Sequence, residues 1–345
     1  MIPVLDKNYF KYHGRILEKN DSVYLGFTNS SMEFYVKGDN DNNLNIIANI
    51  STKLNGTMND ARLKIFLDDY DIPSSILVLD KENADYFIAS FNDDKIHKVT
   101  IIKITEAAMS YAAINKLLIN GGELLSLPPI EDTRLKVEFI GDSITCGYGV
   151  HGLPDSLYHI KDEDGLYSYA ALAAKELNLN ARYFCVSGFG VFTRYDGDRD
   201  GIISKVYPYT NYFVDETISY DPNEFVPDLY VINLGTNDSG HLHDNEIAKG
   251  FVHNYVELLL TLRRNSQNAK ILCTCGTLCT NAFSYIIDAV NIAKKMGLTK
   301  LYTLEFPYHN VLEDGMASGH PSIITHAKDS KLLIHKINEI ININI

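Results

Sequence analysis

The chain has 345 residues, of which 46% are hydrophobic and 22% are charged, which is the composition of a globular protein with a sizeable core. Its length favours two domains over one. The formal net charge of −13 argues against nucleic acid or an anionic membrane surface as a partner, because both require a surplus of Lys and Arg.

No apolar stretch is long enough to span a bilayer, and no basic segment followed by an apolar run opens the chain. We therefore expect a cytoplasmic protein, or a secreted one if a leader has been removed. The five cysteines include no CxxC pair and no zinc spacing, so we expect structural thiols, no metal and no cofactor. The sequence leaves open whether the chain forms an oligomer.

The first part of the chain, residues 1–126, consists of runs of strand length rich in Val, Ile, Phe and Tyr. Clusters of Asn, Asp, Gly and Ser separate these runs, a pattern that predicts an antiparallel β-sandwich domain. The stretch 107–119 is ambiguous, since it could be read as a helix that Gly121 and Gly122 would end early. The runs that we expect to be strands are 31–38, 43–50, 61–70, 74–80, 86–91 and 97–105.

Residues 127–134 contain two prolines and several charges without periodicity, and they predict a linker. From residue 135 to 345 apolar strands alternate with amphipathic helices, which predicts an α/β domain whose parallel sheet is covered on both faces. Ligands of such sheets bind beyond the carboxyl ends of the strands. The expected strands are 136–141, 181–187, 227–235, 269–278 and 298–306, and the expected helices are 165–178, 245–265, 282–297 and 322–340.

Polar blocks follow these strands at the ends where a ligand would bind. The blocks are Gly141-Asp142-Ser143, Ser187-Gly188, Gly235-Thr236-Asn237-Asp238 and, before the last helix, His320-Pro321. Each block is common by itself. Their occurrence together and in this order predicts one site at the carboxyl edge of the sheet.

The residue types in these blocks suit ester hydrolysis. Ser143 would be the nucleophile, and it needs a base such as His320 to take its proton. Attack on an ester carbonyl places negative charge on oxygen, which needs donors already in place. The candidates are the N–H groups of Ser143 and Gly188 and the side-chain amide of Asn237.

These residues match the four blocks of the SGNH (GDSL-like) hydrolases. The longer strings GDSITCGYG, SGFGV and GHPSIITHAK resemble carbohydrate esterase family two, the two-domain acetyl esterases. The resemblance implies an amino-terminal jelly-roll sandwich followed by a flavodoxin-like SGNH domain. It also implies that the chain removes acetyl groups from acetylated carbohydrates, as acetyl xylan esterases do with xylan or xylo-oligosaccharides, without a metal.

One position departs from the pattern, because most SGNH hydrolases have Asp three residues before the catalytic His and this chain has Ala317. Such an aspartate accepts from the imidazole Nδ1–H and fixes the tautomer. Two substitutes are open: a backbone carbonyl among residues 317–319, or the side chain of Asp314. We favour the carbonyl.

Several other residues near the blocks have a structural and a functional reading. Asp142 and Asp238 are expected to accept hydrogen bonds from loop N–H groups rather than to act in catalysis. His326 lies six residues after His320. Six helical residues turn by about 600°, so the two side chains would not share a helix face, and we expect His326 to be structural. Tyr148 and Phe189 are candidates for an apolar wall against a sugar ring.

Two further functions stay open at this point. The first is a short-chain esterase of the same chemistry that acts on non-carbohydrate esters. The second is a glycan-binding protein whose catalytic site has decayed, an idea that Ala317 favours and the intact Ser143, Gly188, Asn237 and His320 oppose.

Overall fold

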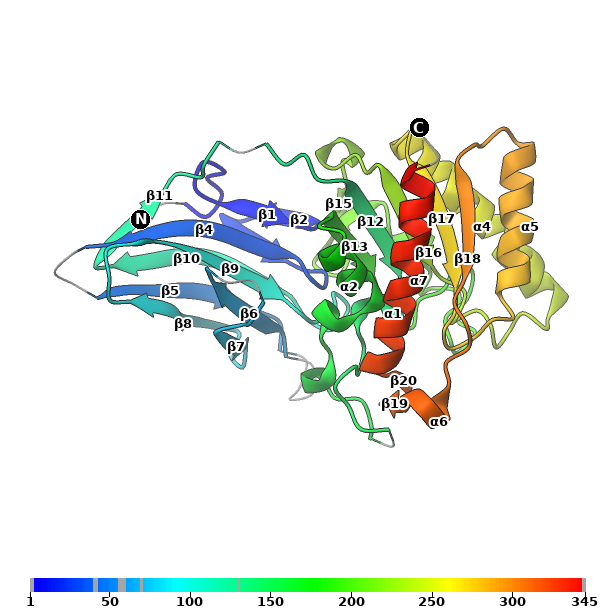
Figure 1. Ribbon diagram of the computed structural model, residues 1–345, viewed down its shortest axis with the longest axis horizontal. Helices are drawn as coiled ribbons and strands as arrows, with labels where there is room; N and C mark the ends of the chain where they lie inside the picture. Colours follow the sequence, from blue (N-terminus) through cyan, green and yellow to red (C-terminus); the bar gives the residue numbers. More distant parts are fainter. Residues whose placement is uncertain are drawn as a thin grey trace. The chain divides into compact units, whose positions relative to one another are not determined.

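The computed structural model describes residues 3–39, 43–54, 60–68, 71–129, 131–154 and 156–342. The chain divides into two compact units, Met1–Asp132 and Thr133–Ile345 (Figure 1). The boundary falls inside the segment 127–134. In the described part of the chain, no helix combines the length and the apolar character needed to cross a membrane.

The first unit is built from two antiparallel sheets. One sheet has the order β1-β4-β9-β6-β7, with β11 paired to β4, and the other has the order β2-β3-β10-β5-β8. The strands are β1 Lys11–His13, β2 Ile16–Lys19, β3 Ser22–Leu25, β4 Ser31–Gly38, β5 Leu44–Ser51, β6 Arg62–Leu67, β7 Ser75–Val78, β8 Asn83–Phe91, β9 Ile96–Lys103, β10 Ala112–Asn120 and β11 Gly122–Leu125.

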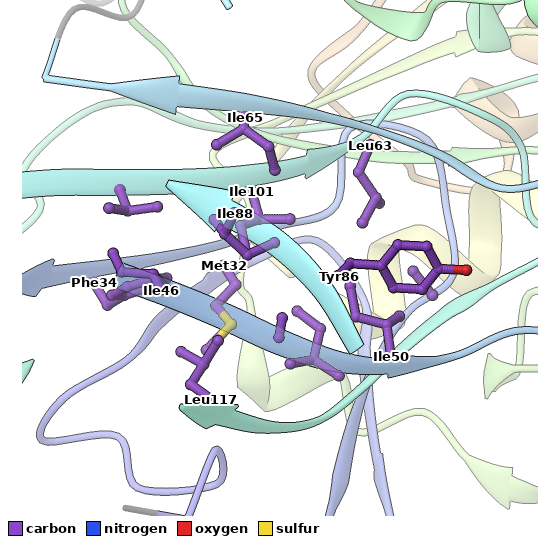
Figure 2. Packing of buried hydrophobic residues seen from close by; sticks show 14 of the residues in the cluster. Met32, Phe34, Ile46, Ile50, Leu63, Ile65, Tyr86, Ile88, Ile101 and Leu117 are labelled. Carbon is purple, nitrogen blue, oxygen red and sulfur yellow. The ribbon is translucent and has the colours of Figure 1, made fainter. Parts of the chain in front are cut away.

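The core of this unit lies between the two sheets. Along β5 every second residue is buried, from Leu44 to Ile50, because alternate side chains of a strand point to opposite faces. Met32 and Phe34 from one sheet meet Ile46 and Ile50 from the other (Figure 2). This arrangement confirms the predicted sandwich.

Each of the six runs predicted to be strands contains a strand, although residues 69–70 of the run 61–70 lie outside the described residues. The ambiguous stretch 107–119 is not a helix, because most of it forms β10, which lies between β3 and β5. The short strands β1, β2, β3 and β11 were not predicted.

The second unit contains a parallel sheet of five strands in the order β13-β12-β16-β17-β18. This is the 2-1-3-4-5 order of flavodoxin-like folds, as predicted. The strands of this unit are β12 Lys136–Gly141, β13 Asn180–Cys185, β16 Leu229–Asn233, β17 Lys270–Cys275 and β18 Leu301–Glu305, with two small hairpins, β14 Tyr209–Asn211 with β15 Asp215–Ser219 and β19 Met316–Ala317 with β20 His320–Pro321.

Helices cover both faces of this sheet (Figure 1). The helices α2 and α7 pack together on one face, and α4 and α5 pack together on the other. The predicted helix 165–178 is shorter than expected, since a 3₁₀ turn, Gly165–Tyr167, precedes α2. The helices are α1 Ser143–Cys146, α2 Tyr169–Glu176, α3 Ile203–Val206, α4 Asn245–Asn265, α5 Phe283–Lys295, α6 Val311–Asp314 and α7 Ile323–Asn342.

The strand order reverses between β12 and β16, so a crevice is expected at their carboxyl ends. Three of the four polar blocks of the sequence lie at the ends of β12, β13 and β16. The fold therefore brings the blocks to the place where such sheets bind ligands.

Candidate active site

Ser143 is the first residue of α1, and only Asp142 separates it from the end of β12. Asp142 caps the helix by accepting from the N–H of Ile144 at 3.0 Å. This cap leaves the N–H of Ser143 without an acceptor among the described residues. The nucleophile thus carries its own free donor at the start of a helix.

The turn after Ser143 is closed by Gly147, whose φ of 76° lies in the left-handed region. A Cβ at Gly147 would meet the carbonyl oxygen of Asp164 at 2.4 Å, so only glycine fits. The N–H of Tyr148 then donates to the carbonyl of Ser143 at 3.1 Å. One turn therefore fixes both Ser143 and Tyr148.

His320 lies against the nucleophile, since its Nε2 is 3.0 Å from Oγ of Ser143. It is held in the β19–β20 hairpin, where it pairs with Ala317. Its Nδ1 is 3.3 Å from the carbonyl oxygen of Ser318. Because a carbonyl only accepts, Nδ1 carries the hydrogen, and Nε2 is left to accept the proton of Ser143.

The second candidate for orienting the imidazole, Asp314, does not take that place. Its carboxylate accepts from Nζ of Lys328 at 2.6 Å, and its side chain is only 5% exposed. The backbone carbonyl of Ser318, one of the three residues proposed from the sequence, is the group that meets Nδ1.

Burial lowers the pKa of His320 to about 4, and the hydrogen bond to the Ser318 carbonyl offsets this in part. The imidazole is therefore neutral, and able to accept a proton, from neutral pH well into the acidic range. In the part of the chain that the structure describes, no carboxylate opposes this shift, in contrast to a full Ser-His-Asp triad.

Donors for a developing oxyanion come from three strand ends. Besides Ser143, the N–H of Gly188 has no acceptor in the described part of the chain. Gly188 has φ of 78°, and a Cβ there would meet the ring of Tyr195 at 3.2 Å. The amide of Asn237 donates to the carbonyl of Phe189 at 2.9 Å and makes a long contact of 3.4 Å with Asp142. An oxyanion could replace that long contact.

The two aspartates of the blocks are buried and hold loops, as expected. Asp238 accepts from the N–H groups of residues 191, 192 and 193 at 2.7 to 2.9 Å. Burial raises its pKa, although these N–H groups lower it, and burial raises the pKa of Asp142 to about 7. His326 is also structural, since its Nδ1 accepts from the N–H of Tyr169 at 3.1 Å.

Tyr148 and Phe189, the two residues predicted to form an apolar wall against a sugar ring, differ in what they present to the site. Tyr148 lies against His320, with ring centroids 4.2 Å apart and planes at 39°. Phe189 is only 8% exposed and packs edge-on against Phe213, so it offers the site its carbonyl rather than its ring. Tyr158, which stacks on the far side of Tyr148, was missed because no sequence motif marks this tertiary contact.

Within the described ranges, no group of three or more His, Cys, Asp or Glu side chains is arranged to hold a metal ion. The groups assembled here are a hydroxyl, a neutral imidazole and fixed N–H donors. Such a set can transfer an acyl group through a covalent intermediate.

Two family profiles match the chain. The GDSL-like lipase/acylhydrolase family matches residues 139–295, and the carbohydrate esterase 2 N-terminal family matches residues 12–129. The first match spans Ser143, Gly188 and Asn237, and the second covers most of the sandwich unit.

Among characterised relatives, the cellulase/esterase CelE of Acetivibrio thermocellus is 35% identical over 237 residues. That alignment covers 67% of this chain but only 28% of the relative. An acetylxylan esterase / glucomannan deacetylase of Cellvibrio japonicus is 22% identical over 259 residues, which are 74% of this chain and 68% of that one.

Solved structures share the architecture over nearly the whole chain. A family two carbohydrate esterase from Clostridium thermocellum, in complex with cellohexaose, superposes with a TM-score of 0.85 at 28% identity and covers 96% of this chain and 99% of that one. The acetyl xylan esterase Est2A from Butyrivibrio proteoclasticus shares the fold with a TM-score of 0.85 at 20% identity, covering 98% and 96% of the two chains.

Proposed function

Because the chain belongs to the GDSL-like hydrolases that carry a carbohydrate esterase 2 amino-terminal domain, we propose that it is a serine esterase that removes acetyl groups from acetylated carbohydrates. The observation that carries the proposal is the contact of 3.0 Å between Ser143 Oγ and His320 Nε2. Such a contact is what a nucleophile and its general base require.

The reaction begins when Oγ of Ser143 attacks the acetyl carbonyl and its proton passes to Nε2 of His320. The bond from Oγ to the acetyl carbon forms, and the carbonyl electrons move to oxygen. The N–H groups of Ser143 and Gly188 and the amide of Asn237 receive that charge.

The intermediate then collapses and the bond to the sugar oxygen breaks. The imidazolium of His320 gives its proton to that oxygen, which leaves as a sugar hydroxyl. A water molecule, deprotonated by His320, then attacks the acetyl carbon on Ser143. The bond from that carbon to Oγ breaks, the imidazolium returns its proton to Oγ, and acetate leaves. The Ser318 carbonyl holds the tautomer through both halves of the cycle.

The relatives suggest the class of substrate. An acetylxylan esterase / glucomannan deacetylase and an esterase bound to cellohexaose both resemble this chain. We therefore propose that the substrates are acetylated β-linked oligosaccharides such as xylo-oligosaccharides, and that the acetyl ester is the group attacked.

The test is hydrolysis of acetylated xylo-oligosaccharides, followed by mass spectrometry as loss of acetyl groups. The wild-type protein should release acetate, and Ser143→Ala and His320→Ala should not. If both variants keep wild-type turnover, the mechanism is wrong.

Two measurements separate the alternatives. A series of p-nitrophenyl esters should show activity falling steeply beyond acetyl or propionyl, whereas a general esterase would accept longer chains. Binding of oligosaccharides by wild type without acetate release would instead favour a glycan-binding protein.

A further inference from the structure

The proposed reaction turns His320 into a cation, and none of the described residues places a carboxylate against its ring nitrogens. Nδ1 of His320 faces the Ser318 carbonyl, and the position that would supply an aspartate is Ala317. Among the residues that the structure describes, no Asp or Glu pairs with either ring nitrogen of His320. The positive charge must therefore be stabilised by another group, or left to the carbonyl alone.

The ring of Tyr148 lies against that imidazole. The two centroids are 4.2 Å apart and the planes are inclined by 39°, so the face of the phenol ring is within reach of the imidazole. A cation within about 6 Å of an aromatic centroid is attracted by the negative face of the ring. The attraction is larger at a desolvated site, and His320 is partly buried.

We propose that Tyr148 stabilises the imidazolium of His320 through the face of its ring, and so supplies part of the charge stabilisation that a carboxylate supplies in a full triad. Tyr148 is in this sense a positioning residue, because it acts through the general base. The inference rests on the proposed function only in that His320 takes the proton of Ser143 during turnover.

The surroundings of Tyr148 fix its ring in this place. Its N–H donates to the Ser143 carbonyl at 3.1 Å, so its backbone is held to that of the nucleophile. On the other side it stacks on Tyr158, with centroids 3.8 Å apart and planes at 13°. The hydroxyl of Tyr158 donates to the fully buried Glu163 at 2.5 Å.

This hydrogen bond places a carboxyl acceptor on the outer ring of the stack. By donating this hydrogen bond, the phenol ring of Tyr158 becomes more electron-rich. The stack then favours a cation at its other end. The order from outside to inside is thus Glu163, Tyr158, Tyr148 and His320, with the charge that forms in catalysis at the inner end.

Another titratable group near His320 is His326, which is buried and whose pKa is lowered to about 3, first by burial and then by repulsion from His320. It is neutral under working conditions and supplies no counter-charge. The stack and the Ser318 carbonyl are therefore the groups that favour the imidazolium.

A fluorination series separates this role from packing and from substrate contact. Tyr148→Phe is the reference, and phenylalanines with one, two and three ring fluorines then replace it at nearly constant volume. Each fluorine weakens the negative face of the ring. We expect kcat to fall stepwise by roughly two- to thirty-fold across the series, the range for loss of one cation–π contact, with little change in KM.

A second readout needs no turnover. The pKa of His320, followed by nuclear magnetic resonance in isotope-labelled protein and assigned by the signal that His320→Gln removes, should fall along the same series. The same analogues at Tyr183, which stacks on Phe139 in the core, form the matched control and should change neither kcat nor the pKa of His320. Thermal unfolding is measured for every variant.

Two results would overturn the proposal. In one, kcat and the pKa of His320 stay constant across the Tyr148 series. In the other only KM changes, which would make Tyr148 a wall for the sugar. Because the titration is read without substrate, its failure is distinct from a failure of wild type to release acetate, which would refute the proposed function instead.

Discussion

Replacing Ala317 by Asp should give the imidazole the carboxylate that it lacks. Ala317 is directly opposite His320 in the β19–β20 hairpin, so the two side chains share a face. The position is 2% exposed, and a buried carboxylate there needs the Nδ1–H as its donor. We therefore expect the new side chain to accept from His320.

The size of the effect follows from the pKa of about 4 that burial gives His320 in the native site. A carboxylate within about 4–6 Å raises the pKa of a neighbouring cation by roughly 1–3 units. With a shift of about two units, roughly one tenth of the imidazole is neutral near pH 5, against about nine tenths in wild type. The variant should thus lose about tenfold in kcat/KM near pH 5, relative to its own plateau.

The assay is the pH profile of kcat/KM, with acetate release followed by proton nuclear magnetic resonance. Wild type should have an acid limb near pH 4, well below that of an ordinary histidine. Ala317→Asn, which has the same size and no charge, is the control and should keep the wild-type limb. The proposed effect of the carboxylate is wrong if kcat/KM of Ala317→Asp and of wild type fall at the same acidic pH. It is also wrong if kcat/KM of wild type falls near pH 6.5.

The remaining predictions concern single groups of the site. Gly188→Ala should lower kcat by roughly tenfold or more, measured on an acetyl ester, because φ of 78° disfavours alanine and the oxyanion donor shifts. Asn237→Ala should lower kcat by about 10²- to 10³-fold and lower the unfolding temperature only slightly, through loss of the hydrogen bond to the Phe189 carbonyl; wild-type kcat would exclude it from the oxyanion site. Asp314→Asn should keep kcat within about twofold and lower only stability, since its carboxylate bonds to Lys328; a large loss of kcat would restore it as the orienter. Asp238→Ala should lower the free energy of unfolding by about 3 kcal/mol or more in denaturant titration, because three N–H groups, two of them buried, lose their acceptor; an unchanged midpoint would contradict this.

The elements that the sequence predicted best have strong periodicity and clear ends. The predicted helix 245–265 coincides with α4, because its apolar face recurs with helical spacing and Asp244 caps its first turn. The strand β10 was not predicted, since its Ala-rich start fits a helix as well as a strand. Pairing with β5 and β3, a tertiary effect, decides its conformation.

The positions of the site could be predicted for a simple physical reason. Parallel strands end at one edge, so blocks that follow them must converge. The group that orients His320 could be narrowed only to a carboxylate or one of three carbonyls, because the choice depends on the backbone of the hairpin, where Ser318 has φ of 51°. The stack of Tyr158 on Tyr148 joins a turn to a later loop and leaves no pattern in the sequence.

The most direct test of the proposed acyl-enzyme mechanism is to trap the covalent intermediate. Wild-type protein is mixed with an acetylated xylo-oligosaccharide, quenched with acid within the first turnovers, and digested for mass spectrometry. The mechanism predicts an acetyl group on the hydroxyl of Ser143, found on the peptide that contains this residue. The acetylated fraction should be larger under conditions that slow attack by water. Steady release of acetate with no acetylation at Ser143 at any quench time, and with full activity in Ser143→Ala, would contradict it.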